Sequence, residues 1–216
     1  MCSLENFAQK GKKIIGIAAN YHELIKILKI PIPEKPGVFL KPPTSYIVEG
    51  ETIRLPKEFE VNEEVELGVV IGKAAKHVSV CDAMEYVGGY CVALDMTATC
   101  QIKAARQNGQ SWTIAKGFDT ACPVSKFIPK SCISDPGNVE LWCNVNGKCR
   151  QRGNTSDLVF NVPFLVSYLS KYMTLEPNDL IVTGSPPGMG PVFPGDVIEG
   201  GIKNIAEFKF KVEHDK

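Results

Sequence analysis

The feature that most constrains the fold is an apolar run, residues 65–71 (VELGVVI), with one carboxylate inside it and another just before it. Its β-branched and aliphatic residues predict a buried strand. Alternate side chains of a strand share a face, so Glu64 and Glu66 are predicted to point the same way, roughly 7 Å apart along the strand. Two carboxylates held that close to a core repel each other and are costly to desolvate. The alternative interpretation is a solvated polar face on an amphipathic strand.

A second apolar run, residues 90–98 (YCVALDMTA), contains a single acid, Asp95. An acid placed where a buried strand ends is typical of a ligand or a catalytic carboxylate. The alternative is that Asp95 caps the helix that follows. Because hard cations such as Mg²⁺ and Ca²⁺ bind carboxylate oxygens, Glu64, Glu66 and Asp95 together predict a site for one divalent cation. Coordination positions would remain for water or substrate.

Size and composition narrow the class of protein. A chain of 216 residues predicts one domain, and 24 basic against 24 acidic side chains give no reason to expect a nucleic-acid partner. The eight cysteines contain no C-x-x-C pair, which favours reduced thiols in an intracellular protein, cytoplasmic or mitochondrial. The first 13 residues lack the apolar segment of a secretory signal, and no run reaches membrane-spanning length, so no membrane partner is expected.

The remaining pattern alternates many short strands with few helices, which favours a β-rich α+β fold. Strands are predicted at 14–19, 38–41, 53–56, 64–72, 90–95, 139–145, 148–152, 179–183, 197–199 and 205–212. Helices are predicted at 21–29 after an Asn20 cap, at 79–87 after a Ser79 cap, at 98–107, and from an Asn161 cap to residue 172. Asn146-Gly147 predicts a tight hairpin turn, and Asn108-Gly109 predicts the end of the third helix.

Four motifs make a resemblance specific. EEVELGVVIGK, DAMEYVGGYCVALDMTA, WTIAKGFD, and DLIVTGSPPGMGP with PGDVIE occur in the order of the fumarylacetoacetate hydrolase family, across essentially the whole chain. The chain most resembles the small acylpyruvase/oxaloacetate decarboxylase branch. The resemblance implies a mixed β-sandwich/β-roll with a few peripheral helices, a homodimer, and Mg²⁺ in an open site, with Mn²⁺ or Ca²⁺ as alternatives. It also implies one catalytic domain over 1–216, with a strand and lid helix in 1–36 and a core in 37–216.

The same resemblance assigns roles to particular positions. It implies metal ligands at Glu64, Glu66 and Asp95. Lys116 would hold a substrate carboxylate or stabilise an enolate; without the resemblance it would be taken for a surface amine. The turn Thr183-Gly184-Ser185 would contact substrate through its hydroxyls, although ordinary turn chemistry explains those residues equally well.

The chain also departs from the family pattern. Where the family has G-R-N-Y, this chain has residues 18–21 (AANY), and where the family has D-M-T-A-R-D it has residues 95–100 (DMTATC). Two arginines that would face an anionic substrate are therefore absent, and neither Ala nor Thr replaces a bidentate clamp.

The hydrolytic branch carries a His and a Glu three residues apart on the lid helix, where the carboxylate can orient the imidazole. A gapless alignment puts Leu24 and Ile27 at those positions. His22 is a candidate lid residue, but its acidic neighbour Glu23 points in a different direction, which favours an exposed histidine instead. The pair is therefore missing from this chain.

These features together predict a Mg²⁺-dependent enzyme acting on small 2-oxo acids. Hydrolysis of acylpyruvates needs an activated water and should be impaired, whereas decarboxylation or tautomerisation of oxaloacetate needs the electron sink but no attacking water. Two alternatives stay open: a degenerate relative that binds metal and dicarboxylate without turnover, and a β-rich interaction module without a metal.

Overall fold

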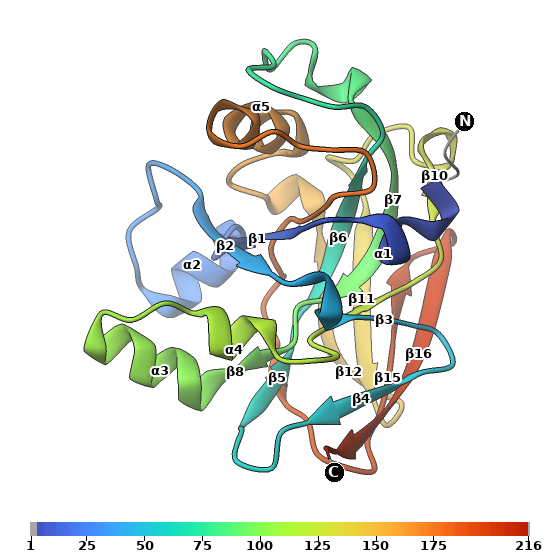
Figure 1. The fold of residues 1–216 in the computed structure, drawn as a ribbon. Helices are drawn as coiled ribbons and strands as arrows, with labels where there is room; N and C mark the ends of the chain where they lie inside the picture. Colours follow the sequence, from blue (N-terminus) through green and yellow to red (C-terminus); the bar gives the residue numbers. More distant parts are fainter. Residues whose placement is uncertain (1–3, 216) are drawn as a thin grey trace.

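The structure, a computed structural model, describes residues 4–215 and is built around one large mixed sheet (Figure 1). Its strands run in the order β2-β1-β13-β6-β7-β9-β3, with β10 paired to β7. They are β1 (Ile14–Ala18), β2 (Gly37–Lys41), β3 (Tyr46–Val48), β6 (Val65–Ile71), β7 (Val87–Leu94), β9 (Cys122–Val124), β10 (Ile128–Pro129) and β13 (Leu180–Val182). Strand β6 lies at the centre, and all seven of its residues are buried, as its apolar sequence predicts.

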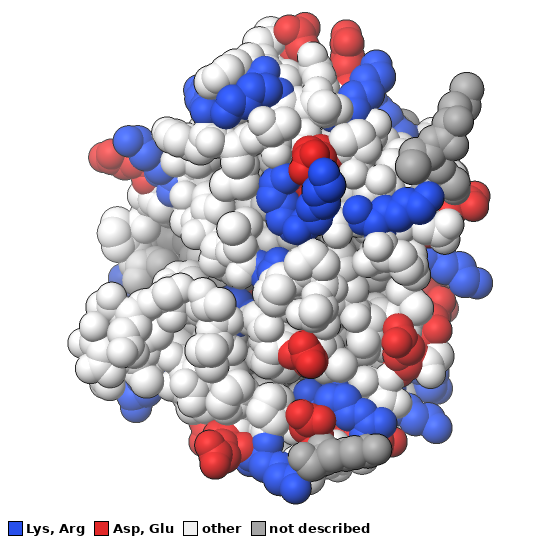
Figure 2. Space-filling view, in the orientation of Figure 1, with Lys and Arg blue, Asp and Glu red and all other residues white. Residues whose placement is uncertain are grey.

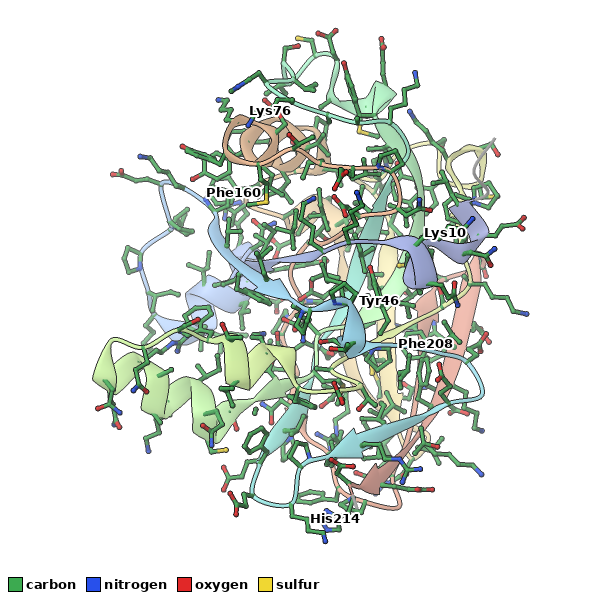
Figure 3. The ribbon with its side chains drawn as sticks, viewed as in Figure 1. Lys10, Tyr46, Lys76, Phe160, Phe208 and His214 are labelled. Atoms are coloured by element: carbon green, nitrogen blue, oxygen red, sulfur yellow. The ribbon has the colours of Figure 1, made fainter. Side chains whose placement is uncertain are left out.

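Two smaller sheets complete the strand framework. The order β12-β11-β15-β16-β4 forms a five-stranded sheet, and β14-β5-β8 forms a three-stranded one. Their strands are β4 (Thr52–Leu55), β5 (Val61–Glu63), β8 (Thr97–Ala98), β11 (Glu140–Val145), β12 (Lys148–Asn154), β14 (Gly190–Pro191), β15 (Val197–Ile202) and β16 (Ala206–His214). The five-stranded sheet packs against the large one through β11 on β6 and β16 on β7. The main core fills this interface, with Leu67, Leu141 and Phe208 all nearly inaccessible. Phe208 is labelled in Figure 3.

The helices lie at the periphery (Figure 1). They are α1 (Phe7–Lys10), α2 (His22–Leu28), α3 (Thr99–Asn108), α4 (Thr113–Gly117) and α5 (Val162–Tyr172), with 3₁₀ turns η1 (Leu4–Asn6), η2 (Pro43–Ser45), η3 (Ala83–Glu85), η4 (Lys130–Cys132) and η5 (Thr155–Asp157). The prediction of a β-rich α+β fold with a few peripheral helices is confirmed.

A helix cap, a hairpin turn and a helix end form where the sequence predicts them. The Asn161 side chain accepts a hydrogen bond from the Phe164 N–H at 3.1 Å and caps α5. Asn146 and Gly147 have positive φ values of 51° and 73° and form the turn between β11 and β12, the conformation that such hairpins favour. Helix α3 ends at Gly109, whose φ of 63° is also left-handed.

Two local predictions are wrong. The segment 79–87 is not one helix: it contains only the short turn η3 before β7 begins at Val87. The Ser79 hydroxyl does accept the Asp82 N–H at 3.2 Å, but this closes a turn rather than starting a helix. Asn20 does not cap α2, because its amide group instead donates to the carbonyls of Thr183 and Phe160 and accepts the Phe160 N–H.

The surface carries both signs of charge. On the face in Figure 2, lysines and arginines are interspersed with aspartates and glutamates, in keeping with the formal net charge of zero. Within residues 4–215, no helix is long and apolar enough to cross a membrane.

Candidate metal centre and adjoining pocket

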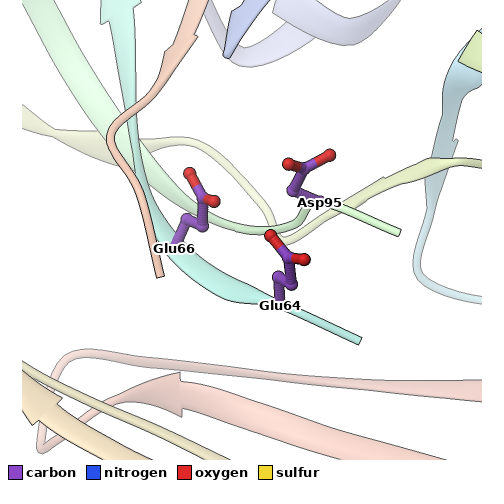
Figure 4. Close-up of side chains that lie close together, drawn as sticks. All are labelled: Glu64, Glu66 and Asp95. Carbon is purple, nitrogen blue, oxygen red and sulfur yellow. The ribbon is translucent and has the colours of Figure 1, made fainter. Parts of the chain in front are cut away.

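The three acids singled out in the sequence lie together where β6 and β7 meet. The two strands are antiparallel, with Val65 opposite Leu94, and the Asp95 N–H donates to the Glu64 carbonyl at 2.8 Å. This register places the ends of both strands side by side, so the side chains of Glu64, Glu66 and Asp95 converge (Figure 4). Each offers a carboxylate oxygen, and these oxygens all lie within 4.8 Å of one another.

The three carboxylates are largely buried, which makes their negative charges unfavourable. Glu66 and Asp95 are each 1% exposed, whereas the Glu64 side chain keeps 19% of its surface accessible. Burial raises the pKa of Glu66 well above its usual range, and the neighbouring charges of Asp95 and Glu64 raise it further. Burial also raises the pKa of Glu64. Three converging hard oxygen donors whose charges are this unfavourable fit a divalent cation such as Mg²⁺, Mn²⁺ or Ca²⁺.

Lys116, at the end of α4, belongs to the same cluster. Its ammonium group forms a close ion pair with Asp95 Oδ2, donates to Thr97 Oγ1 at 2.6 Å, and lies 3.5 Å from Glu64 Oε2. It also lies 4.6 Å from the centre of the Phe39 ring. Burial raises the pKa of Asp95, but the charges of Lys116 and Lys41 outweigh burial and lower it overall. Asp95 is therefore held as a carboxylate.

Lys41 is a component of the cluster that sequence reasoning missed. Its side chain is fully buried, and Nζ lies 2.7 Å from Asp95 Oδ1. The same ammonium group is within hydrogen-bonding distance of the carbonyl oxygens of Met96 (3.1 Å), Lys116 (2.6 Å) and Ala121 (2.8 Å). Lys41 therefore fixes Asp95 and ties together the segments that carry Asp95 and Lys116. The sequence does contain one indication that Lys41 is buried. Alternate residues of a strand share a face, and this places Lys41 on the same face of β2 as the buried Phe39.

The turn after β13 contributes a backbone donor to the cluster. The Gly184 N–H donates to Glu66 Oε2 at 2.6 Å. Gly184 has a φ of +102°, and a Cβ there would lie 2.7 Å from Asn20 Cβ, so only glycine suits this position. The turn thus orients one of the three acids through its main chain.

The hydroxyls of this turn have protein partners. Thr183 donates to the Leu67 carbonyl at 3.0 Å. Ser185 accepts a 2.6 Å hydrogen bond from Gln151 Nε2 and donates to the Pro186 carbonyl at 3.3 Å. Gln151 is fully buried and also accepts the Val65 N–H at 2.9 Å. These contacts link the turn to the start of β6, a link that the isolated sequence motif did not indicate.

A cavity of about 460 Å³ opens beside the cluster. Its lining residues come from the end of β1, the residue before β6, strand β8, helices α2 and α3, helix α4 with the residue before it, and the loop before β14: Ala18, Ala19, Leu24, Leu28, Glu64, Thr97, Thr99, Ile102, Lys103, Arg106, Gln107, Trp112, Lys116 and Met189. Glu64 and Lys116 connect the cavity to the acids.

Several of the positions at which this chain departs from the family pattern line the same cavity. Ala19 and Thr99 stand where the resemblance implies arginines, and Leu24 stands where it implies the lid histidine. The exposed His22, at the start of α2, is outside this lining, and Ile27 points to solvent with 59% of its surface accessible. Within residues 4–215, the cavity lining therefore includes no imidazole.

Comparisons with known proteins identify the family. Residues 13–213 match the family described as fumarylacetoacetate (FAA) hydrolase C-terminal. A protein named oxaloacetate decarboxylase, mitochondrial, from Dictyostelium discoideum is 47% identical over 204 residues, covering 94% of each chain. The human protein named oxaloacetate tautomerase FAHD1, mitochondrial, is 44% identical over 211 residues, covering 97% of this chain and 96% of its own.

A solved structure of a related enzyme has the same fold. The crystal structure of fumarylpyruvate hydrolase from Pseudomonas aeruginosa, in complex with Mn²⁺ and pyruvate, superposes with a TM-score of 0.88 at 31% identity, covering 95% of this chain and 91% of that one. Family, sequence relatives and fold all favour an enzyme over an interaction module. The chain therefore belongs to the fumarylacetoacetate hydrolase family of enzymes.

Proposed function

We propose that this protein is a Mg²⁺-dependent enzyme acting on small 2-oxo acids, with decarboxylation or tautomerisation retained and acylpyruvate hydrolysis impaired. The observation that carries the proposal is the convergence of three carboxylates within 4.8 Å, with Lys116 beside them and a cavity leading to them. The printed names of its relatives, oxaloacetate decarboxylase and oxaloacetate tautomerase, support this substrate class. Mn²⁺ in a related hydrolase supports a divalent cation.

Each residue of the cluster has a defined part in this proposal. Glu64, Glu66 and Asp95 would hold the cation, which when bound polarises the 2-oxo carbonyl of a substrate. Lys116 places a positive charge next to the acids, where it stabilises negative charge that develops on the substrate oxygen. Lys41 and the Gly184 N–H keep Asp95 and Glu66 oriented, as outer hydrogen-bond partners of metal ligands do.

The cavity supports the predicted impairment of hydrolysis. Attack on a distal carbonyl needs a base that activates water, and losing such a base typically costs 10²–10⁴-fold in rate. Leu24 occupies the position of the expected histidine, and among the described residues the cavity lining includes no imidazole. Decarboxylation and keto–enol conversion need a stabilised negative charge but no attacking water, and the retained cluster would stabilise that charge. Keto–enol conversion also needs a group or a water molecule that takes the C3 proton.

The direct test is an assay of the purified protein with Mg²⁺ on acetylpyruvate and oxaloacetate side by side. We expect turnover of oxaloacetate to exceed hydrolysis of acetylpyruvate by a wide margin. Rapid hydrolysis of acetylpyruvate would show that another residue supplies the base. Repeating the assay with Mn²⁺ and Ca²⁺ identifies the preferred metal.

The second candidate is a degenerate relative that binds metal and dicarboxylate without turnover. It is favoured by the two missing arginines, replaced by Ala19 and Thr99 in the cavity wall. Calorimetry with oxalate, which mimics an enolate, separates the two. Tight Mg²⁺-dependent binding of oxalate, with no turnover of any 2-oxo acid, would favour the degenerate form.

Assembly and compartment are part of the same proposal. The family resemblance implies a homodimer of single-domain subunits, which sedimentation analysis would test against a monomer mass of 23.6 kDa. The relatives whose printed names include "mitochondrial" favour a mitochondrial over a cytoplasmic location. Fluorescence microscopy of the protein tagged at its C-terminus would decide between those compartments.

A further inference from the structure

Helix α3 contributes two cations to the cavity that have no acidic partner. Lys103 and Arg106 both belong to the cavity lining, and within residues 4–215 neither forms an ion pair with a carboxylate. The third cation of the lining, Lys116, is already paired with Asp95 and Glu64. The cavity therefore has two positive charges that an anionic ligand can use.

These cations lie on the helix face that also carries Thr99. Residues 99, 103 and 106 are spaced by four and then three positions, which places them on one face of a helix, and all three line the cavity. Thr99 is a position at which the family resemblance implies an arginine. The positive charge that is missing there is present one and two turns further along the same face.

Two aromatic rings connect Arg106 with Lys116. The Arg106 guanidinium lies 5.2 Å from the centre of the Trp112 ring, and the Trp112 and Phe39 ring centres are 6.2 Å apart. On the far side of this pair, Lys116 Nζ lies 4.6 Å from the centre of the Phe39 ring. A guanidinium held over a ring still has N–H groups for a carboxylate, and it has less freedom to lose when a ligand binds.

A dicarboxylic 2-oxo acid matches this distribution of charge. Its 2-oxo acid head would bind at the three acids through the divalent cation, beside Lys116. A second carboxylate in the same cavity is unfavourable without a partner. An arginine suits it best, because the planar guanidinium can bind both carboxylate oxygens. The cavity volume of about 460 Å³ is typical of a site for a small ligand.

We propose that Arg106, assisted by Lys103, binds the second carboxylate of dicarboxylic 2-oxo acids and so selects them over monocarboxylic ones. Oxaloacetate belongs to this class. The inference rests on the proposed function, because it assumes that the 2-oxo acid head binds at the three acids. It assigns to α3 the anion recognition that the resemblance implies for arginines at positions 19 and 99.

Three ligands with the same head group test the proposal. They are oxamate, N-oxalylglycine, which adds a carboxymethyl group, and N-oxalylglycinamide, in which the added group ends in an uncharged amide. Calorimetry with the Mg²⁺-loaded protein measures the affinity of each. We expect N-oxalylglycine to bind about fivefold more tightly than N-oxalylglycinamide, as a charge-assisted pair at a partly exposed site does. Equal affinities of these two ligands would overturn the proposal.

Substitutions test the assignment to α3. Arg106→Gln should remove most of the advantage of N-oxalylglycine and Lys103→Gln a smaller part, while the affinity for oxamate stays within about twofold. Arg152→Gln is the matched control, because it removes an exposed cation outside the cavity lining. With oxaloacetate as substrate, Arg106→Gln should raise KM about fivefold and change kcat less.

The possible failures are distinguishable. If oxamate does not bind in the presence of Mg²⁺, the proposed function fails and this inference fails with it. If oxamate binds but Arg106→Gln leaves the preference for N-oxalylglycine intact, the proposed function stands and the role of Arg106 is wrong. If Arg106→Gln and Arg152→Gln weaken all three ligands alike, the cations act only through the general field of the protein, which also overturns the inference.

Discussion

The acid–lysine cluster (Glu64, Glu66, Asp95, Lys41 and Lys116) and the cavity wall (Leu24, Ile102, Trp112 and their apolar neighbours) lie side by side but differ in construction. Most charged groups of the cluster are buried, and each has an ion pair or a hydrogen bond with a neighbouring residue. The wall is formed mainly by apolar side chains, and parts of it, such as Leu28 at 52% exposure, face solvent.

This difference determines how far the effect of a substitution spreads through the site. Buried charges depend on one another, because removing one partner leaves another unpaired in a medium that solvates it poorly. A change in the cluster therefore disturbs the whole site, whereas a change in the wall exchanges one apolar or polar surface for another. The cluster retains every acid and the lysine that the family resemblance implies, whereas Ala19, Leu24 and Thr99, at which the chain departs from the family pattern, line the cavity.

Glu66→Gln should give the largest effect, because it removes one of the three proposed charged ligands while keeping the shape of the side chain. We expect kcat/KM for a 2-oxo acid to fall by about a thousandfold, since the polarising cation supplies several kcal/mol. The rise in melting temperature with added Mg²⁺ should also be lost. Glu58→Gln, at an exposed position, is the control; an equal loss there would show that the effect is not specific to the cluster.

Lys41→Met should destabilise the fold itself. The substitution keeps an unbranched side chain but removes the buried cation beside Asp95 and leaves three carbonyl groups without its hydrogen bonds. Breaking a buried ion pair typically costs about 3–5 kcal/mol of unfolding free energy, which urea titration would measure. Lys57→Met, on the surface, should change little. A loss below about 1 kcal/mol for Lys41→Met would contradict the interdependence of the cluster.

Introducing a His–Glu pair on α2 should raise the rate of acetylpyruvate hydrolysis. In Leu24→His/Ile27→Glu the two new side chains lie three residues apart on α2, so the carboxylate can orient the imidazole. We expect acetylpyruvate hydrolysis to rise about a hundredfold, at the lower end of general-base effects, while oxaloacetate turnover changes little. Leu24→His/Lys26→Glu is the control, because its acid points away. Equal gains in both variants would refute the assignment of the lid.

The smallest expected effect concerns the backbone of the wall. Ala19 has a φ of +48°, a conformation that costs an L-residue roughly 1–2 kcal/mol. Ala19→Gly relieves this cost but increases the freedom of the unfolded chain, so we expect a net gain of about 0.5 kcal/mol in unfolding free energy. Ala18→Gly, in the regular strand β1, should lower stability instead. A loss in both variants would show that packing at Ala19 outweighs its backbone conformation.

The sequence predicts the acids well because their positions follow from strand periodicity and from recognisable motifs. Glu64, Glu66 and Asp95 flank or interrupt apolar runs, and such runs pair in a way that brings their ends together. The hairpin at Asn146-Gly147 and the Asn161 cap are local effects of the same kind, set by residues a few positions apart.

Long-range contacts explain what the sequence does not predict. Lys41 resembles a surface lysine at the end of a strand, because Val38 and Leu40 on the opposite face are as apolar as Phe39 and hide which face is buried. Asn20 has a good capping side chain, but Phe160 and Thr183, about 140 and 163 positions away, use its amide group. No local pattern reveals either partner.

The placement of β1 has a consequence for synthesis of the chain. Strand β1 pairs in parallel with β13, with Ile14 opposite Leu180, so β1 cannot complete its pairing until the much later strand β13 has been made. Until then the apolar residues 14–18 lack one neighbouring strand, and Glu66 lacks the hydrogen bond from Gly184. We expect the nascent chain to depend on chaperones late into translation, because pairing between such distant segments is slow and leaves aggregation-prone strands exposed.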